Sequence, residues 1–273
     1  MLKSKIRSVL NSIKDLMYYL EWRCQKSPPE SVYFYTFHKC ASSLSSRYVL
    51  KNVEGLRHVD YASQIYCGKR VKKVVFHKKG YVYGPIRLSA PPVSEEYKML
   101  VKRASAYEFI RDRIGIFLLR DPRDIIVSSY YSFGYTHGFS PVAEIRESQE
   151  KRRNVIQSKT IDQYALESAT GALCNFDRLH RLSKACNRGV VLKYEDMIEN
   201  WDVFAEDLTK YIDIKPAVLG EIFEKSRPPV EEKKDSHRRS GRPSGFRDKL
   251  KPGTVASLNW TFKRVLEQCH YGA

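Results

Sequence analysis

Lys39 is the residue whose surroundings indicate the clearest chemistry in this chain. It follows the apolar, aromatic run 33–37, which has the composition of a buried strand, and it precedes Ser42 and Ser43, where a helix over 44–50 can begin. A loop between a strand and a helix presents free N–H groups, the helix dipole favours negative charge, and a lysine adds a full positive charge. This pattern fits a phosphate-binding site, and it fits equally an ordinary strand–turn–helix whose serines cap the helix.

A second group of polar residues follows the apolar run 114–119. Arg120 comes directly after this run, and Ser128 lies eight residues later, two turns into the helix that is expected to follow. The two side chains can therefore face the same anion. The alternative for Arg120 is an ion pair with Asp121 or Asp124.

Two further stretches complete the candidate ligand residues. Tyr194 ends a third apolar run, where it is either a ligand contact or a core residue. The basic stretch 238–246 contains Arg239, Ser240 and Gly241, and its alternative is a flexible basic loop without a ligand. Two separated anion sites on one sheet suit a nucleotide that is phosphorylated at both ends of its ribose.

These residues can meet only if a common framework carries them to one place. Strands that alternate with helices predict an α/β fold, a single domain with a central, mainly parallel sheet flanked by helices and a P-loop-like phosphate-binding loop. In such a sheet the carboxyl ends of the strands bind ligands. The stretch 80–85 is expected to be a loop or short edge element, and 133–158 a mobile surface segment. The expected strands are 33–37, 72–77, 114–119 and 189–194.

Composition limits the classes of protein that fit. The 273 residues can bury a full core, and the hydrophobic content of 42% argues for a folded chain. The net charge of +17 predicts attraction to polyanions without choosing among them. The six cysteines form no Cys-x-x-Cys pair, which argues against a metal site and predicts reduced thiols in a cytoplasmic protein.

The N-terminal stretch 1–26 is expected to be a basic amphipathic helix ahead of the α/β domain, 27–273. Ile6, Leu10 and Ile13 fall at helical spacing among lysines and arginines. The stretch lacks a long uncharged apolar run, so it resembles neither a transmembrane helix nor a signal peptide. It is expected to pack on the domain, and peripheral contact with a membrane surface is the second interpretation.

Four blocks in order make the chain resemble the PAPS-dependent sulfotransferases, where PAPS is 3′-phosphoadenosine 5′-phosphosulfate. Together they span Tyr33 to Phe262, nearly the whole chain. The chain departs from the family pattern at Ala41, where glycine is usual, and at Phe246, where tryptophan is usual. The blocks are 36–43, similar to the family's 5′-phosphosulfate loop, 117–128, similar to its 3′-phosphate block, 193–197, similar to its Tyr-Glu-Asp-Met strand end, and 239–247, similar to the loop that closes over the 3′-phosphate.

This resemblance implies transfer of a sulfuryl group from PAPS to a hydroxyl or amine of an acceptor. The product nucleotide would be 3′,5′-adenosine bisphosphate, and no metal ion would be needed. Lys39 would also stabilise the charge that develops on the leaving 5′-phosphate. The implied cofactor-binding residues are His38, Lys39, Cys40, Ala41, Ser42, Ser43, Arg120, Ser128, Tyr194, Arg239, Ser240 and Gly241.

The family's usual general base is a histidine at the end of a strand between the two phosphate blocks. His77 fits that place, because it follows the expected strand 72–77 and a histidine titrates in the useful range. The alternative is a solvated histidine in a basic run. Glu95, Glu96 and Asp60 are the carboxylates that could replace it.

Two other functions are weaker fits. A P-loop kinase-like phosphotransferase would need the loop G-x-x-x-x-G-K-[ST], which the sequence lacks. A non-catalytic polyanion or nucleic-acid binder would explain the charge but not four ordered blocks, so no nucleic-acid partner is expected. The acceptor is expected to be a small molecule or a glycan. Nearby basic residues fit an acidic or sulfated glycan, and nearby tyrosines fit sugar rings or a planar small molecule equally well.

Overall fold

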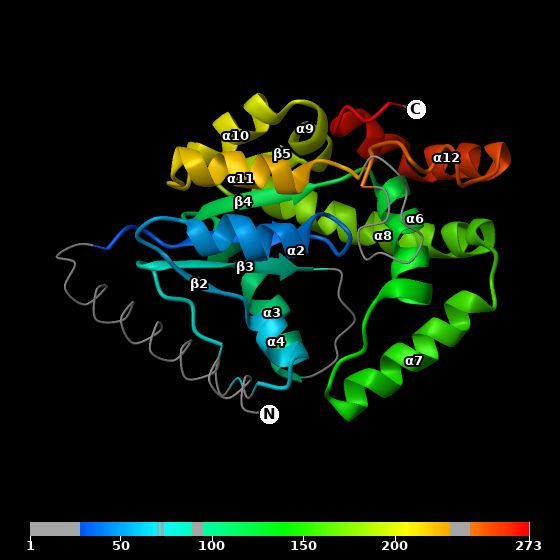
Figure 1. Ribbon diagram of the computed structural model, residues 1–273, viewed down its shortest axis with the longest axis horizontal. Helices are drawn as coiled ribbons and strands as arrows, with labels where there is room; N and C mark the ends of the chain where they lie inside the picture. The colour runs from blue at the N-terminus through cyan, green and yellow to red at the C-terminus, as the bar shows by residue number, and fades with distance from the viewer. Residues whose placement is uncertain (1–27, 70, 72–73, 89–94, 230–240, 273) are drawn as a thin grey trace.

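The computed structural model describes residues 28–69, 71, 74–88, 95–229 and 241–272. The helix expected over 1–26 lies outside these residues. A five-stranded, all-parallel sheet with strand order β2-β3-β1-β4-β5 crosses the centre of the molecule (Figure 1). The expected α/β fold is therefore confirmed.

In chain order the elements are β1 (Val32–Thr36), α2 (Ser42–Leu44), the π-helical turn η1 (Ser45–Val49), the 3₁₀ turn η2 (Leu50–Asn52), β2 (Arg57–Val59), α3 (Tyr61–Tyr66), β3 (Tyr81–Arg87), α4 (Glu95–Ala104), α5 (Tyr107–Ile110), β4 (Ile114–Leu119), α6 (Pro122–Tyr131), the π-helical turn η3 (Ser132–Thr136), α7 (Ala143–Gln157), α8 (Ile161–Lys184), β5 (Arg188–Lys193), α9 (Tyr194–Glu199), α10 (Trp201–Thr209), α11 (Pro216–Ser226) and α12 (Pro252–Gln268).

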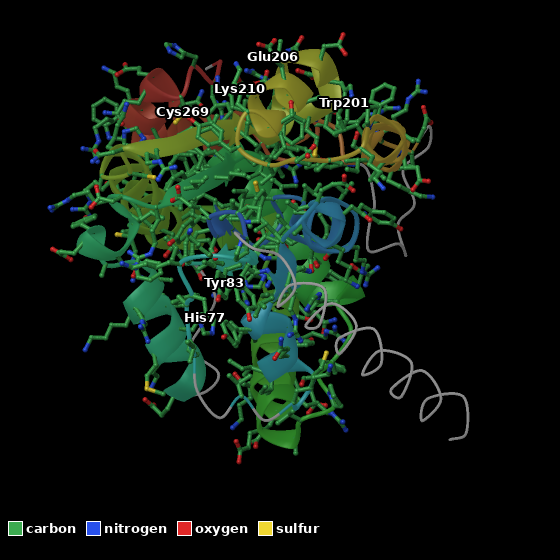
Figure 2. The ribbon with its side chains drawn as sticks, turned by 90° about the vertical axis from the view of Figure 1, so that its left-hand side faces the viewer. His77, Tyr83, Trp201, Glu206, Lys210 and Cys269 are labelled. Carbon is green, nitrogen blue, oxygen red and sulfur yellow. The ribbon has the colours of Figure 1, made fainter. Side chains whose placement is uncertain are left out.

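The two central strands form the middle of the core. All five residues of β1 are buried, as are the last five of β4, because helices cover both faces of the sheet. Tyr35 of β1 stacks on Phe117 of β4 with ring centroids 5.1 Å apart. The short helical turns after β1 lie on one face and α8 on the other (Figures 1 and 2). These layers hold the ends of β1 and β4 rigidly beside each other.

Further helices lie toward the two lateral edges of the sheet. Helices α9 and α10 pack against β5, whereas α3 and α4 contact β3 (Figure 1). The C-terminal helix α12 packs on α8, which also contacts α6. Within the residues described, no helix has the length and apolarity needed to span a membrane.

The structure corrects two of the expected strand assignments. Residues 74–77 form no strand, whereas β3, at 81–87, is an interior strand rather than a loop or edge element. The sequence misled because Gly84 and Pro85 interrupt β3. A register shift in the pairing of β1 with β3 accommodates them, and a Cβ at Gly84 would lie 2.6 Å from the carbonyl oxygen of Phe34.

The segment 133–158 was expected to be a mobile surface segment, and the structure shows a largely exposed helix in it. It contains α7, whose Ile145 and Ile156 are both buried. These two residues are eleven positions apart, which is three helical turns, so one face of α7 packs inward. The methyl group of Ile156 lies against Gly134, where any larger side chain would clash. The few apolar residues of this helix stand among many charged ones, so the sequence pattern did not predict it.

Candidate active site

A cavity of about 800 Å³ lies where the carboxyl ends of the strands meet the helices that follow them. All strands of a parallel sheet point the same way, so the residues that follow β1, β4 and β5 reach this one edge. The structure thus brings together residues that are far apart in the sequence. Nine of the expected cofactor-binding residues line the cavity: His38, Lys39, Ala41, Ser42, Ser43, Arg120, Ser128, Tyr194 and Gly241.

Hydrogen bonds to β4 hold the loop that follows β1. The Thr36 hydroxyl donates to the carbonyl oxygens of Leu118, at 3.0 Å, and of Cys40, at 3.3 Å. The Cys40 thiol also donates to the Leu118 oxygen, at 3.4 Å. Cys40 is fully buried and does not line the cavity, so its side chain fixes the loop instead of contacting a ligand.

The same loop holds two non-glycine residues in the left-handed backbone region. Lys39 has φ of 65° and Ala41 has φ of 48°. Such a residue costs about 1 kcal/mol relative to glycine, which the sulfotransferase pattern places at position 41. This kind of strain concentrates at ligand-binding turns, where the fold over-determines the backbone. The conformation therefore agrees with a ligand-binding turn.

Lys39 places a partly desolvated ammonium group in the cavity. Its Nζ donates to the hydroxyl of Ser132 at 2.9 Å. Burial, together with the positive charge of Arg120, lowers the pKa of Lys39 to about 8. A bound anion would favour the charged form of Lys39, so this group is suited to hold a phosphate.

Arg120 joins the Lys39 loop to the far side of the cavity. Its Nη1 donates to the carbonyl oxygen of Lys39 at 2.8 Å, and its guanidinium lies 4.2 Å from the ring centre of Tyr194 and 3.9 Å from Asp124. Within the described residues, its buried Nε has no hydrogen-bond acceptor. A phosphate oxygen would supply one, so the donor set of this cavity fits a phosphorylated ligand.

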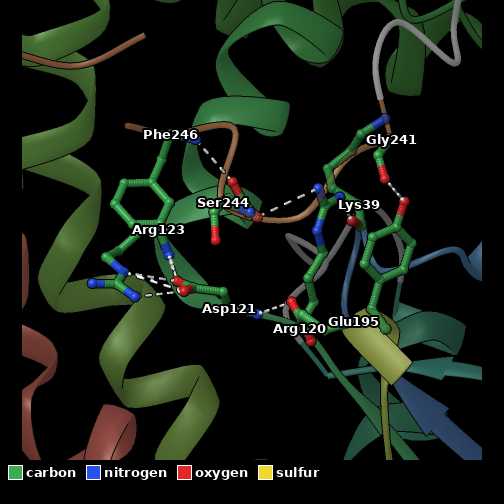
Figure 3. A network of polar contacts seen from close by, with 10 residues as sticks. Lys39, Arg120, Asp121, Arg123, Glu195, Gly241, Ser244 and Phe246 are labelled. Carbon is green, nitrogen blue, oxygen red and sulfur yellow. Dashed lines mark hydrogen bonds and ion pairs between the residues drawn. The ribbon is translucent and has the colours of Figure 1, made fainter. Parts of the chain in front are cut away.

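The late basic loop is docked onto the start of α6 (Figure 3). Asp124 accepts from the backbone N–H of Ser244, at 2.8 Å, and of Phe246, at 3.0 Å. The buried ring of Phe246 packs under the Arg123 guanidinium, 4.2 Å away. Arg123 in turn makes a two-point ion pair with Asp121, with its Nη2 2.7 Å from the carboxylate. The aromatic residue at 246 thus fixes this loop against the core.

The late loop also meets the residue that follows β5. The hydroxyl of Tyr194 donates to the carbonyl oxygen of Gly241 at 2.5 Å. Gly241 has φ of 71° and lines the cavity. Arg239 and Ser240, which were expected to contact the nucleotide, lie outside the described residues. Their contact with a nucleotide stays a prediction.

Glu195 is a buried carboxylate behind the cavity. Its Oε1 accepts from the backbone N–H of Asp121 at 3.0 Å, which ties the end of β5 to the end of β4 (Figure 3). No group in the described parts of the chain donates to its buried Oε2. Burial therefore raises the pKa of Glu195 to about 7.

Replacing Glu195 with glutamine is expected to stabilise the protein above pH 7. The carboxyl titrates at about 7 in the folded state and at 4.5 when unperturbed. The free energy of unfolding therefore falls by on the order of 2–3 kcal/mol as pH rises from 4.5 through 7, because the folded chain must ionise a buried acid. Glu195→Gln keeps the acceptor for Asp121 and cannot ionise. Urea unfolding at several pH values should show a flatter pH dependence than in the wild type.

The matched control for this change is Glu206→Gln. Glu206 is an exposed residue of α10, 3.2 Å from Lys210 (Figure 2). It should change the pH dependence of stability little, because exposed ion pairs contribute little. An unaltered pH dependence in Glu195→Gln would mean that Glu195 is ionised in the folded protein at neutral pH.

His77 does not reach the cavity. It is exposed and lies near Tyr83, before the amino end of β3 (Figure 2), whereas Lys39 follows the carboxyl end of β1, which is parallel to β3. Its carbonyl oxygen accepts from the Tyr33 hydroxyl at 3.1 Å, and its ring stacks on Tyr81 with centroids 5.0 Å apart. The expectation that His77 ends a strand at the site fails because the strand there is β3, which ends at Arg87.

Two of the carboxylates that could replace His77, Asp60 and Glu95, do not line the cavity. Asp60 caps α3 by accepting from the Ser63 N–H at 2.8 Å, and it lies 3.8 Å from Arg87. Glu95 begins α4, where it pairs with Lys98 on the surface. Nothing in the structure describes the side chain of Glu96.

Several cavity residues were missed from the sequence. Arg87 ends β3, and His137 and Arg152 come from the segment around η3 and α7. The stretch 80–85 was expected to be a loop or short edge element and 133–158 a mobile surface segment, so the polar residues in and beside them could not be placed at the cavity. The signal that could have found Arg87 is the β-branched and aromatic content of 81–87, once its glycine and proline are discounted.

Comparison with solved structures finds proteins of similar fold. The chain aligns with the crystal structure of mouse sulfotransferase SULT7A1 complexed with PAP at a TM-score of 0.52 and 13% identity, over 87% of this chain and 84% of that one. It also aligns with retinol dehydratase in complex with androsterone and inactive cofactor PAP, at a TM-score of 0.40 and 13% identity, over 91% and 85%. No family model and no curated protein sequence matches. The likeness to the mouse protein shows that this chain has the fold of sulfotransferases.

Proposed function

We propose that this chain is a PAPS-dependent sulfotransferase, which moves a sulfuryl group from PAPS to a hydroxyl or amine of an acceptor. The observation that carries the proposal is one cavity with two cationic positions, the Lys39 loop and the Arg120 side chain with the late loop. These positions belong to the blocks that resemble the family's two phosphate sites. The shared fold with a sulfotransferase complexed with PAP adds support.

Each end of the nucleotide has its own residues in this proposal. PAPS, when bound, supplies the sulfuryl group and a phosphate leaving group. Lys39, with Ser42 and Ser43 at the start of α2, holds the 5′ end and neutralises the charge that develops there. Arg120 and Ser128 hold the 3′-phosphate through charge-assisted hydrogen bonds. The late loop, fixed through Asp124 and Tyr194, covers this end. The proposed location of the protein is the cytoplasm, because its cysteines are expected to be reduced thiols.

His38 takes the role of general base in this proposal, in place of His77. It lines the cavity directly beside Lys39. Burial, with the positive charges of Arg87 and Arg152, holds the pKa of His38 well below its usual 6.5. Its ring is therefore neutral at pH 7 and can accept the proton of an acceptor hydroxyl.

Thermal unfolding with three ligands tests the proposal. We expect 3′,5′-adenosine bisphosphate to raise the unfolding temperature, because a ligand that binds only the folded state stabilises it. ATP with magnesium should do so less, and a duplex oligonucleotide should act only at low salt. Selective stabilisation by ATP with magnesium would favour a kinase-like enzyme. No shift with the bisphosphate would remove the sulfotransferase proposal.

A further inference from the structure

A second, smaller cavity of about 250 Å³ adjoins the first, between α6 and α8. Three residues line both cavities: His38, Phe133 and Arg152. Two of them touch edge to face, with the rings of His38 and Phe133 5.8 Å apart. Residues at and beside the proposed base are therefore part of the wall of both cavities.

Of these three residues, Arg152 carries a full positive charge. Its guanidinium lies 3.8 Å from the ring centre of Phe133. In the regions that the structure describes, it has no hydrogen bond and no carboxylate within ion-pair distance. Its neighbour on α7, Arg153, differs, since it donates to the backbone oxygens of Phe133 and His137. Arg153 thus holds the η3 turn, and Arg152 is left to face the cavities.

The charge around this point is strongly one-sided. The main cavity is lined by nine lysine and arginine side chains and two carboxylates, Asp124 and Asp248. Lys39 and Arg120 are assigned to the nucleotide, and Arg87 lies near Asp60. Among these nine cations, Arg152 is the one that also lines the smaller cavity, and it lies flat against the ring of Phe133. A guanidinium in such a position is suited to bind a carboxylate or sulfate through two parallel hydrogen bonds.

The smaller cavity has the character of a site for a ring. Phe37, Tyr164 and Phe176 offer aromatic surface, and Ser168 and Asn175 offer polar groups. Its volume equals that of roughly eight waters in the liquid, enough for one substituted ring. At Gly171 on α8 an added Cβ would meet no atom within 4 Å, so this wall is open.

We propose that the acceptor is an anionic ring compound that spans both cavities, with its carboxylate or sulfate bound by Arg152. This inference rests on the proposed sulfotransferase function and adds the class of acceptor. The reacting hydroxyl lies on the His38 side of Phe133, and a second ring occupies the smaller cavity. The anion is recognised by Arg152, and Phe133 packs against the ring that carries it.

Binding to the full chain in the presence of 3′,5′-adenosine bisphosphate tests this proposal. The probes are two matched acid and ester pairs at physiological salt, measured by calorimetry. One pair is 4-nitrophenyl glucuronide and its methyl ester, and the other is 4-hydroxybenzoate and its methyl ester. We expect at least one acid to bind about tenfold tighter than its ester, the size of a charge-assisted hydrogen bond. The pair that shows it identifies a sugar acid or a planar aromatic acid.

Arg152→Gln should remove the preference for the acid over the ester. The control is Lys151→Gln on the same helix, an exposed residue paired with Glu147, which removes the same charge outside the cavities. This control should keep the preference. Equal binding of acid and ester to the wild type, no binding of either acid, or a preference that survives Arg152→Gln would each overturn the proposal.

Filling the smaller cavity gives a second measurement. Gly171→Leu should weaken the two-ring glucuronide by about tenfold and leave the single-ring benzoate unchanged, since leucine also favours a helix. Gly220→Leu on α11 is the control, because a Cβ there also meets nothing within 4 Å. An unchanged glucuronide affinity in Gly171→Leu would exclude the smaller cavity. If the wild type is not stabilised by the bisphosphate, it is the sulfotransferase function that fails instead.

Discussion

Lys39→Met is expected to abolish measurable sulfuryl transfer while leaving the fold intact. The change removes the cation that the structure holds in the cavity, 2.9 Å from Ser132. Losing a charged hydrogen bond to phosphate should weaken 3′,5′-adenosine bisphosphate by about 10- to 100-fold. Turnover should fall by a further factor of about 100, because charge develops on the leaving phosphate. Calorimetry and transfer from labelled PAPS measure the two effects.

The same variant should be more stable than the wild type without nucleotide. The pKa of Lys39 is lowered from 10.5 to about 8, so its charged form opposes folding at pH 7. That penalty is present below pH 8 and disappears as pH rises toward 10.5. Removing it should add about 1 to 3 kcal/mol at pH 7. Opposite changes in stability and binding would distinguish loss of a ligand contact from misfolding.

Lys210→Met is the matched control for the loss of one lysine. Lys210 is exposed on the surface, 2.8 Å from Asp207 (Figure 2). It should bind the bisphosphate like the wild type. If both variants bind equally well, Lys39 does not contact the nucleotide and the phosphate loop is a structural turn.

His38→Asn is expected to lose turnover and keep nucleotide binding. Loss of a general base costs about 10²- to 10⁴-fold in rate. The bisphosphate should still bind within about twofold, a difference below 0.5 kcal/mol. Pre-steady-state transfer to an acceptor, alongside calorimetry, separates the two quantities.

His77→Ala is the control for this assignment. It removes an exposed histidine that precedes the amino end of β3 and should leave turnover unchanged (Figure 2). A loss of turnover in His77→Ala with full activity in His38→Asn would reverse the assignment and restore the histidine expected from the sequence.

Much of the framework could be predicted from the sequence. The cores of β1, β4 and β5 are continuous apolar runs, which need no tertiary information to recognise. The polar residue that follows such a run must emerge at the carboxyl edge of a parallel sheet. For this reason Lys39, Arg120 and Tyr194 could be assigned to one cavity, and the structure places all three in its lining.

What the sequence could not supply is the identity of the neighbours across the sheet. The place of β3 between β2 and β1 is given by the strand order and by a register shift opposite Gly84. Neither of these has a signal in the local sequence. This choice of strand moves the cavity edge from His77 to Arg87.

The side of the cavity proposed for the acceptor was likewise decided by tertiary structure alone. Helix α7 is charged along most of its length, and it forms a wall only because Ile145 and Ile156 pack inward. That packing brings Arg152 to Phe133 and His38. The sequence therefore determined the proposed nucleotide side, where Lys39, Arg120 and Tyr194 each follow a strand. Only the folded chain determined the proposed acceptor side, because contacts between remote segments depend on how they pack.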